Sequence, residues 1–351
     1  MLRFEKKILG TLPKCYSLAK ISINGEPNIL VAAEKHDACY LFDKEGNKKA
    51  TVWEGPGGVM SMVPLPGESG MFLATQKFYS PNDASDAKIV LAAAESMEQW
   101  SVKTLVNLPF VHRFDILESA GIRYLIACTI KSEPEPKDAW KTPGKVLVAE
   151  LPKELSLYDN RHQLPLKIIR DDLFKNHGYY RAEKDGVPGC LVSSEQGVLF
   201  LSPPAKHGEA WLEEQLLREP SSDAVLLDLD GDGEQELVVF QPFHGDTLKI
   251  FKLRSGKYIP VYELEEPAPF LHALYGGPLC GRQIVVFGHR RGRRNLMALY
   301  YDSRERSYKT DVIDHDCGSA NVLCGKRGNT DYIFSANREI DQIAMYYVYP
   351  E

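Results

Sequence analysis

Three aspartates recur at alternate positions in the stretch Asp228-Leu-Asp230-Gly-Asp232-Gly-Glu-Gln-Glu236. Glycines between them let a short loop turn its carboxylates inward, and carboxylate oxygens are the ligands that Ca²⁺ prefers. We expect Asp228, Asp230 and Asp232 to supply oxygens, with a backbone carbonyl near Glu234 and the carboxylate of Glu236 completing the shell. The stretch therefore predicts a calcium loop, and the alternative is an acidic turn without a bound ion.

This loop differs from an EF-hand, because it lacks the glutamate of loop position 12 and because the apolar run Leu237–Phe240 predicts a strand, not a helix. The stretch resembles the calcium loops of FG-GAP/VCBS-type repeats, a resemblance that covers about one repeat. In those repeats the loop joins the first two strands of a β-propeller blade. The resemblance implies that calcium here stabilises a blade and lies away from the chemistry.

Short apolar runs, each preceded by a turn that contains glycine, recur along the chain about 40–65 residues apart, as the blades of a propeller do. We interpret them as the second strands of seven blades: Ile29–Ala33, Met71–Thr75, Tyr124–Cys128, Gly189–Ser193, Glu236–Phe240, Gln283–Phe287 and Asp331–Ser335. A third strand is expected after each, and weaker fourth strands after most of them.

The last repeat stops at its third strand, and the segment Phe4–Thr11 predicts an N-terminal strand with no blade before it. We expect this strand to complete the seventh blade and to close the ring, since a closed ring leaves only short, protected edges. The sequence thus predicts an all-β fold, a single seven-bladed β-propeller domain over residues 1–351.

Composition indicates an ordinary soluble globular protein, with 44% hydrophobic residues, 26% charged residues and a net charge of −6. The negative charge gives no reason to expect nucleic acid as a partner, and no segment predicts a membrane helix or a signal peptide. Seven scattered cysteines without CxxC spacing favour reduced thiols and a cytoplasmic location. A secreted form whose leader has been removed is the alternative. We expect a monomer or a small homo-oligomer.

Seven of the nine histidines fall on one predicted face of the propeller, where second-to-third strand loops meet the connections into first strands. Converging imidazoles suit a transition metal such as Mn²⁺, Zn²⁺ or Fe²⁺. Taken singly, each histidine is explained as well by a structural or exposed role. As a group they predict a central metal site whose ligands we expect among His112, His272, His289 and His315.

Other polar side chains are expected on the same face. The run His289–Arg294 is the densest positive patch of the chain, and guanidinium groups suit carboxylates or phosphates, although a charged hairpin tip is the alternative. For acid–base work we predict His177, Tyr180 and Lys131. For binding an anionic substrate we predict Arg290, Arg291, Arg181 and Lys77.

Two functions remain open on this sequence. By architecture the chain is similar to the propeller polysaccharide lyases, such as oligogalacturonate lyase, and to aldos-2-ulose dehydratase. That likeness implies a metal-dependent carbon–oxygen lyase that performs β-elimination on an anionic or keto sugar in the central funnel. The alternative is a non-catalytic propeller that binds a glycan or a protein and uses calcium only for structure.

Overall fold

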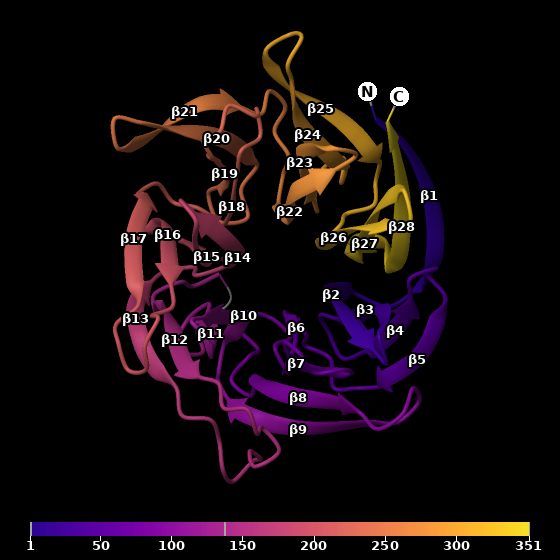
Figure 1. Ribbon diagram of the computed structural model, residues 1–351, viewed down its shortest axis with the longest axis vertical. Coiled ribbons are helices and arrows are strands. Elements are labelled where there is room, and N and C mark those ends of the chain that lie inside the picture. The colour runs from indigo at the N-terminus through magenta and orange to yellow at the C-terminus, as the bar shows by residue number, and fades with distance from the viewer. Residues whose placement is uncertain (1, 137, 351) are drawn as a thin grey trace.

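The computed structural model describes residues 2–136 and 138–350, which form seven four-stranded antiparallel sheets around a common axis. Each sheet is one blade. In every blade the first strand lies nearest the axis and the last lies at the rim (Figure 1). The predicted seven-bladed, all-β propeller is confirmed.

Four of the seven blades come first along the chain. The first contains β2 (Cys15–Ile23), β3 (Glu26–Ala33), β4 (Cys39–Asp43) and β5 (Lys48–Trp53). The second contains β6 (Met62–Pro64), β7 (Met71–Gln76), β8 (Lys88–Ala94) and β9 (Trp100–Asn107). The third contains β10 (Val111–Ser119), β11 (Ile122–Thr129), β12 (Gly144–Glu150) and β13 (Lys167–Leu173). The fourth contains β14 (Gly178–Lys184), β15 (Val187–Ser194), β16 (Gly197–Ser202) and β17 (Leu212–Leu217).

Three blades complete the ring. The fifth contains β18 (Asp223–Leu227), β19 (Glu236–Gln241), β20 (Thr247–Arg254) and β21 (Lys257–Glu263). The sixth contains β22 (Leu271–Leu279), β23 (Arg282–His289), β24 (Leu296–Asp302) and β25 (Ser307–Asp314). The seventh contains β26 (Asn321–Arg327), β27 (Thr330–Asn337), the short 3₁₀ helix η1 (Arg338–Ile340), β28 (Gln342–Pro350) and β1 (Leu2–Thr11). Among the described residues, no helix has the length and apolar character that crossing a bilayer requires.

The N-terminal strand closes the ring as predicted. β1 pairs antiparallel with β28, from Leu2 opposite Pro350 to Thr11 opposite Gln342, so the two ends of the chain lie side by side (Figure 1). The seventh sheet therefore has the order β1-β28-β27-β26. This pairing hides the strand edges that an open ring would expose.

The seven predicted second strands all lie within observed strands, because these apolar runs are buried on both faces of their sheets. All six residues of β19 are buried, for example. Its side chains pack between blades: Val238 and Phe240 share one core cluster with Val285 and Phe287 of the sixth blade. Each large apolar side chain buried in this way stabilises the fold by about 1.5–3 kcal/mol. These cores between blades hold the first strands around the axis.

Candidate functional site

The same backbone turn places a side chain at the axis in four blades. Tyr16, His112, His177 and His272 occupy equivalent positions at the start of a first strand. Each follows, by two residues, a residue with positive φ: Lys14 (51°), Phe110 (63°), Lys175 (50°) and Phe270 (65°). The register of the sheet also shifts at Tyr16, His112 and His272, so that each is the extra residue of a β-bulge. Since bulges redirect side chains, the repeated turn aims these rings at the axis.

The three histidines of this set are held by the same hydrogen bond. Nδ1 of His112 donates to the carbonyl of His177, 3.2 Å away, and Nδ1 of His177 donates to the carbonyl of Ser222, also at 3.2 Å. Nδ1 of His272 donates to the carbonyl of Ala320 at 2.8 Å. Each acceptor is the equivalent residue of the next blade. Because Nδ1 carries the proton, Nε2 keeps its lone pair, which is the form of histidine that binds metals.

A fourth histidine, His244, meets two of these rings from the connection between β19 and β20. Ligand atoms of His177, His244 and His272 all lie within 4.8 Å of one another, and Nε2 of His244 is 3.3 Å from Nε2 of His177. Two nitrogens bound to one zinc at about 2.0–2.1 Å in a tetrahedral site lie about 3.3 Å apart. The donor set therefore fits a transition metal, and we call these residues the histidine centre.

Two phenylalanine rings fix the plane of His244. Phe243 stacks on one side at a centroid distance of 3.9 Å, and Phe270 stacks at 4.1 Å. The His244 backbone has a positive φ of 50°, which turns the side chain back toward the axis. A ligand held between two rings loses little further freedom when it binds a metal.

The surroundings keep the imidazoles neutral. Burial lowers the pKa of His112, His244 and His272 well below the usual value of 6.5, and nearby positive groups, among them Arg113 and Arg290, lower it further. A neutral ring is the form that a metal requires. The carboxylate of Asp223 lies 3.3 Å from Nδ1 of His177, an arrangement common behind metal-bound histidines.

A buried tyrosine lies next to the histidine centre. The hydroxyl of Tyr16 is 3.1 Å from Nε2 of His272, and Arg113 donates a hydrogen bond to that hydroxyl at 3.4 Å. Burial raises the pKa of Tyr16, so the phenol keeps its proton at neutral pH. In the absence of a metal, this phenol is the donor for the Nε2 lone pair.

Two cavities border the histidine centre from different sides. The first, which we call the mouth, has a volume of about 620 Å³, and its walls include Trp140, Phe243, His244, Phe270 and Arg291. The second, which we call the channel, has a volume of about 530 Å³. Its lining includes His272, Arg113, Asp223, Tyr180 and Arg181. His244 lines the mouth and His272 lines the channel, so the histidine centre borders both cavities.

The predicted substrate-binding arginines have different environments. Arg291 lies over the ring of Phe270 at 4.9 Å and lines the mouth. Arg290 also lies over Phe270, but its guanidinium is paired with Glu339 at 2.8 Å. Arg181 lines the channel and is paired with the carboxylate of Asp115 at 2.6 Å. Arg291 is therefore the guanidinium best placed to meet an anion at the mouth.

The predicted acid–base residues are only partly brought together. His177 belongs to the histidine centre, where its Nε2 lies 3.3 Å from Nε2 of His244. The hydroxyl of Tyr180 lies on the channel wall, donates to the carbonyl of Gly276 at 3.0 Å and accepts from its amide at 2.9 Å. Burial raises the pKa of Tyr180. Tyr180 thus has both hydrogen-bonding roles occupied by backbone.

Both predicted lysines lie apart from the centre. Lys131 is fully buried and donates to Glu135 at 3.0 Å, to Asn82 at 3.0 Å and to the carbonyl of Ala139. Its ammonium group is saturated, so it is not free to move a proton. Lys77 follows β7 and lines neither the mouth nor the channel.

Three of the four predicted metal ligands, His112, His289 and His315, are not part of the histidine centre. Nδ1 of His289 donates to the carbonyl of Arg291 at 2.8 Å, and its Nε2 accepts the amide of Asn295 at 3.0 Å. With both nitrogens engaged by backbone, His289 offers no lone pair to a metal. His315 faces the side chain of Asn295, 3.3 Å away. Of the four predicted ligands, His272 joins the centre, and His112 stacks beside His177 at a centroid distance of 4.7 Å.

His244 and Tyr16 were missed as site residues, and the sequence contains a signal for the first. Pro109-Phe110-Val-His112, Pro242-Phe243-His244 and Pro269-Phe270-Leu-His272 share a Pro-Phe pair just before histidine. Read as a repeated motif, this pattern would have selected His244. Tyr16 has no such signal, because only its place in the fold makes it equivalent to the histidines.

The predicted calcium loop connects β18 to β19. Carboxylate oxygens of Asp228, Asp230 and Glu236 lie within 4.8 Å of one another, as the ligands of one cation would. The ammonium group of Lys252, however, contacts Asp230 at 2.6 Å, Asp232 at 2.5 Å and Glu236 at 2.9 Å. The loop therefore already encloses a positive charge, and the calcium site stays a prediction.

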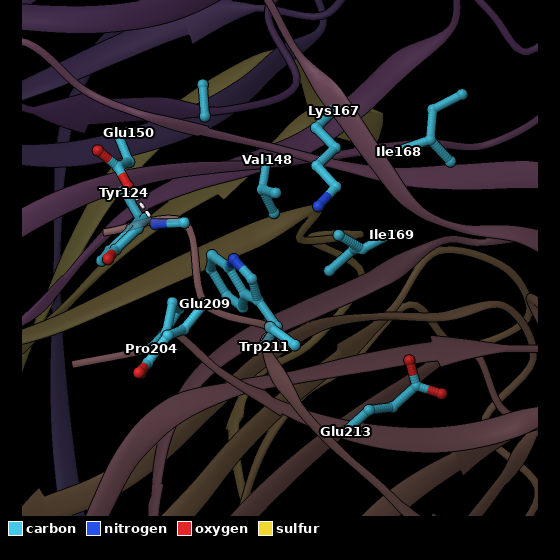
Figure 2. Close-up of a pocket in the computed structure, with 13 residues that line it drawn as sticks. Tyr124, Val148, Glu150, Lys167, Ile168, Ile169, Pro204, Glu209, Trp211 and Glu213 are labelled. Atoms are coloured by element: carbon cyan, nitrogen blue, oxygen red, sulfur yellow. Dashed lines mark hydrogen bonds between the residues drawn. The ribbon is translucent and has the colours of Figure 1, made fainter. Parts of the chain in front are cut away.

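A further pocket lies between the third and fourth blades, lined by residues of β11, β12 and β13 and of the segment that leads into β17 (Figure 2). Its volume is about 410 Å³, and its walls include Tyr124, Val148, Glu150, Lys167 and Trp211. The ring of Trp211 meets Tyr124 edge-on at 5.7 Å. This pocket shares no residue with the mouth or the channel.

Comparisons with known proteins support the fold alone. No family model matches the chain, and no curated protein matches it. Among solved structures, the chain is similar to the WD40 β-propeller domain of Doa1, with a TM-score of 0.58, 11% identity, and 99% of this chain and 98% of that chain covered. It is also similar to the Dos1 propeller, with a TM-score of 0.58, 9% identity, and 95% of this chain and 77% of that chain covered. The resemblance to FG-GAP/VCBS repeats and to propeller lyases stays a hypothesis.

Proposed function

We propose that the protein is a metal-dependent enzyme whose metal is held by Nε2 of His177, His244 and His272. The observation that carries this proposal is the 3.3 Å contact between the Nε2 atoms of His177 and His244. Two lone pairs that face each other repel unless a proton or a metal lies between them. Three protein ligands also leave one position of a tetrahedral metal open, as in catalytic rather than structural sites.

The substrate that best suits these surroundings is a small anionic or keto sugar, which enters from the mouth. Trp140 and Phe243 meet edge to face at 4.9 Å and offer apolar surface to a sugar ring. The guanidinium of Arg291 supplies a positive charge for a carboxylate. Such a wall selects molecules that combine a flat apolar face with a negative group.

The reaction that we propose is β-elimination, in which a water molecule takes the proton from the carbon next to a carboxylate or ketone, the β-oxygen leaves with a proton from an acidic side chain, and the water returns its proton to that side chain. A bound divalent metal would polarise the carboxylate or ketone and make that carbon more acidic. The residue nearest the centre that carries a proton is Tyr16, which Arg113 orients. Tyr16 lines neither cavity but touches His272, and it is the candidate donor to the leaving oxygen, ahead of Tyr180, Lys131 and His177.

A non-catalytic role, the binding of a glycan or a protein, is the second candidate. The pocket between the third and fourth blades favours it, since Trp211 presents aromatic surface there, backed by the buried ring of Tyr124 (Figure 2). Aromatic rings of this kind are common in both glycan and protein recognition. In this alternative the histidine centre would have no bearing on binding.

Metal analysis separates the two candidates. Protein purified without chelator is analysed by mass spectrometry of the elements, for the wild type, His177→Ala, His244→Ala and, as control, His162→Ala, whose side chain is 78% exposed in an outer loop. We expect about one equivalent of Mn, Zn or Fe in the wild type and the control, and a loss of affinity of more than about a hundredfold in the other two. Metal content that is unchanged by both substitutions would refute the proposed centre.

Metal-loaded protein is then incubated with uronates and keto sugars, and the ultraviolet absorbance of the new conjugated double bond is followed. Turnover that disappears in His244→Ala supports the enzyme. A stoichiometric metal without any elimination would refute the lyase step and leave the binding role as the better explanation.

A further inference from the structure

The acidic loop between β18 and β19 uses its first carboxylate to build its own backbone turn. Oδ1 of Asp228 accepts the amides of Gly231 at 2.8 Å and Asp232 at 3.1 Å, and Oδ2 accepts the amide of Gly233 at 3.0 Å. Both oxygens of Asp228 are therefore engaged. These amides hold the carboxylate in place but leave Oδ2 with a lone pair, so the carboxylates that face the interior of the loop decide whether Ca²⁺ can bind.

The three carboxylates that remain all point at one ammonium group. Nζ of Lys252 lies 2.6 Å from Asp230, 2.5 Å from Asp232 and 2.9 Å from Glu236. A lysine has three N–H donors, and here each donor has its own carboxylate. The cation site is thus saturated by the chain itself.

This lysine comes from the neighbouring strand by register. Leu237 of β19 pairs with Phe251 of β20, so Glu236 and Lys252 are the next residues along the two strands. The Lys252 side chain is 8% exposed and that of Glu236 is fully buried. Burial alone would lower the pKa of Lys252, but its hydrogen bonds to the three carboxylates outweigh that effect and raise it. Lys252 therefore keeps its charge at neutral pH.

We propose that Lys252 is the resident cation of the acidic loop and that it excludes calcium from the fifth blade. Calcium could enter only by displacing a buried ammonium group from three carboxylates, or by binding beside a like charge. The loop has the carboxylates of a calcium site, and the ammonium group of Lys252 occupies the position that calcium would take. Removal of that side chain should open the site.

One consequence concerns the use of chelators on this protein. With no calcium in the loop, a chelator withdraws metal only from the histidine centre, and the fifth blade stays folded. The inference does not depend on the proposed function, because the acidic loop shares no residue with the histidine centre.

The test compares calcium binding by the wild type, Lys252→Met and Arg254→Met. Arg254 is the matched control, because it lies on the same strand and pairs with Glu234 of the same loop, but is exposed. Each protein is freed of calcium on a chelating resin and titrated with CaCl₂ in a calorimeter, with MgCl₂ as the reference cation. Thermal unfolding is then followed with and without CaCl₂.

We expect the wild type and Arg254→Met to bind no calcium up to about 1 mM, the weak end of natural calcium modules. Lys252→Met should bind about one equivalent, and calcium should raise its unfolding temperature by several degrees. If this variant folds only when calcium is present, that result also supports the proposal. A wild type that binds one calcium ion, with binding lost in Asp230→Asn, would overturn it. Failure of both Lys252→Met and Lys252→Gln to bind calcium would overturn it as well.

Discussion

The histidine centre and the acidic loop both gather side chains of the types that bind metals, but their interiors differ. In the acidic loop, Lys252 meets three carboxylates and leaves no donor or acceptor unmatched. In the histidine centre, the Nε2 atoms of His177 and His244 lie 3.3 Å apart and share at most one proton. A side chain of the protein, Lys252, neutralises the acidic loop. Among the described residues, no lysine or arginine takes the corresponding place between the ring nitrogens of the histidine centre.

This difference shows that ligand-type residues at suitable spacing do not by themselves make a metal site. A site also needs an interior that no other side chain satisfies. The two places also differ in their exposure to cavities. Two cavities border the histidine centre, whereas the carboxylate of Glu236 in the acidic loop is fully buried. We therefore regard the loop as part of the fold and the centre as the place of chemistry.

The largest effect is expected from Glu236→Ala in the acidic loop. This change removes one partner of the buried Lys252 ammonium and leaves the amide of Leu229 without its acceptor. We expect the free energy of unfolding to fall by about 3–5 kcal/mol, as for other broken buried ion pairs. Urea denaturation measures it. A loss below about 1 kcal/mol would mean that Lys252 is not held as described, and Glu236→Gln, which keeps the shape, should cost less.

Acidification should act on the histidine centre rather than on the loop. Burial lowers the pKa of His112 and His272 below 6.5, so that an unfolded chain takes up these protons before the folded one does. Stability is then complete above about pH 6.5 and is lost as the pH falls below it, by up to about 1.4 kcal/mol per pH unit for each histidine.

For these two histidines the loss over the first pH units is up to about 2.7 kcal/mol per unit. Urea denaturation of metal-free protein from pH 7.5 to 5.5 measures it, and the pair His112→Gln and His272→Gln should flatten the dependence. Stability that stays constant or rises on acidification would contradict the buried, neutral state of these rings.

A smaller effect is expected from Asp223→Asn, behind His177. The carboxylate of Asp223 lies 3.3 Å from Nδ1 of His177 and supports its orientation and basicity. We expect the metal affinity to fall by about 10–100-fold, the usual result of losing such a partner. Competition with a chromophoric chelator measures it. Asp115→Asn is the control, because Asp115 lines the same channel but pairs with Arg181; an equal loss in both variants would count against a specific role.

The smallest effect is expected at the exposed edge of the acidic loop. Glu234 and Arg254 form an ion pair whose side chains are 62% and 46% exposed. Solvent screens such pairs, so Glu234→Gln should change the free energy of unfolding by less than about 0.5 kcal/mol. Urea denaturation of Glu234→Gln and of Glu236→Ala, measured side by side, compares an exposed glutamate with a buried one. A much larger loss of unfolding free energy for Glu236→Ala would show that burial, and not charge alone, makes the ion pair important. Equal losses would remove that distinction.

Local sequence patterns were enough to predict the ring. Buried runs such as Gln283–Phe287 follow glycine turns, and the unpaired segment Phe4–Thr11 left one way to close the seventh blade. The common face of the histidines also followed from this topology, since His112, His177, His244 and His272 do lie together. These features depend on short-range signals and on the order of strands.

Which side chains converge could not be predicted, because it depends on backbone details. The positive φ of Phe270 and the bulge at His272 turn that ring to the axis, whereas the hydrogen bonds of His289 take up both of its nitrogens. Likewise, the spacing of the aspartates predicts a calcium loop, but Lys252 enters it from another strand. Long-range register, rather than residue type, decided both cases.

An element-specific anomalous diffraction map tests the central claim most directly. Crystals of protein purified without chelator are exposed to Zn²⁺ and Ca²⁺, and data are collected on both sides of the zinc absorption edge. The account predicts one zinc peak at about 2.0–2.1 Å from the Nε2 atoms of His177, His244 and His272, with Lys252 still among its three carboxylates. A cation bound in the acidic loop, and none among the histidines, would contradict it.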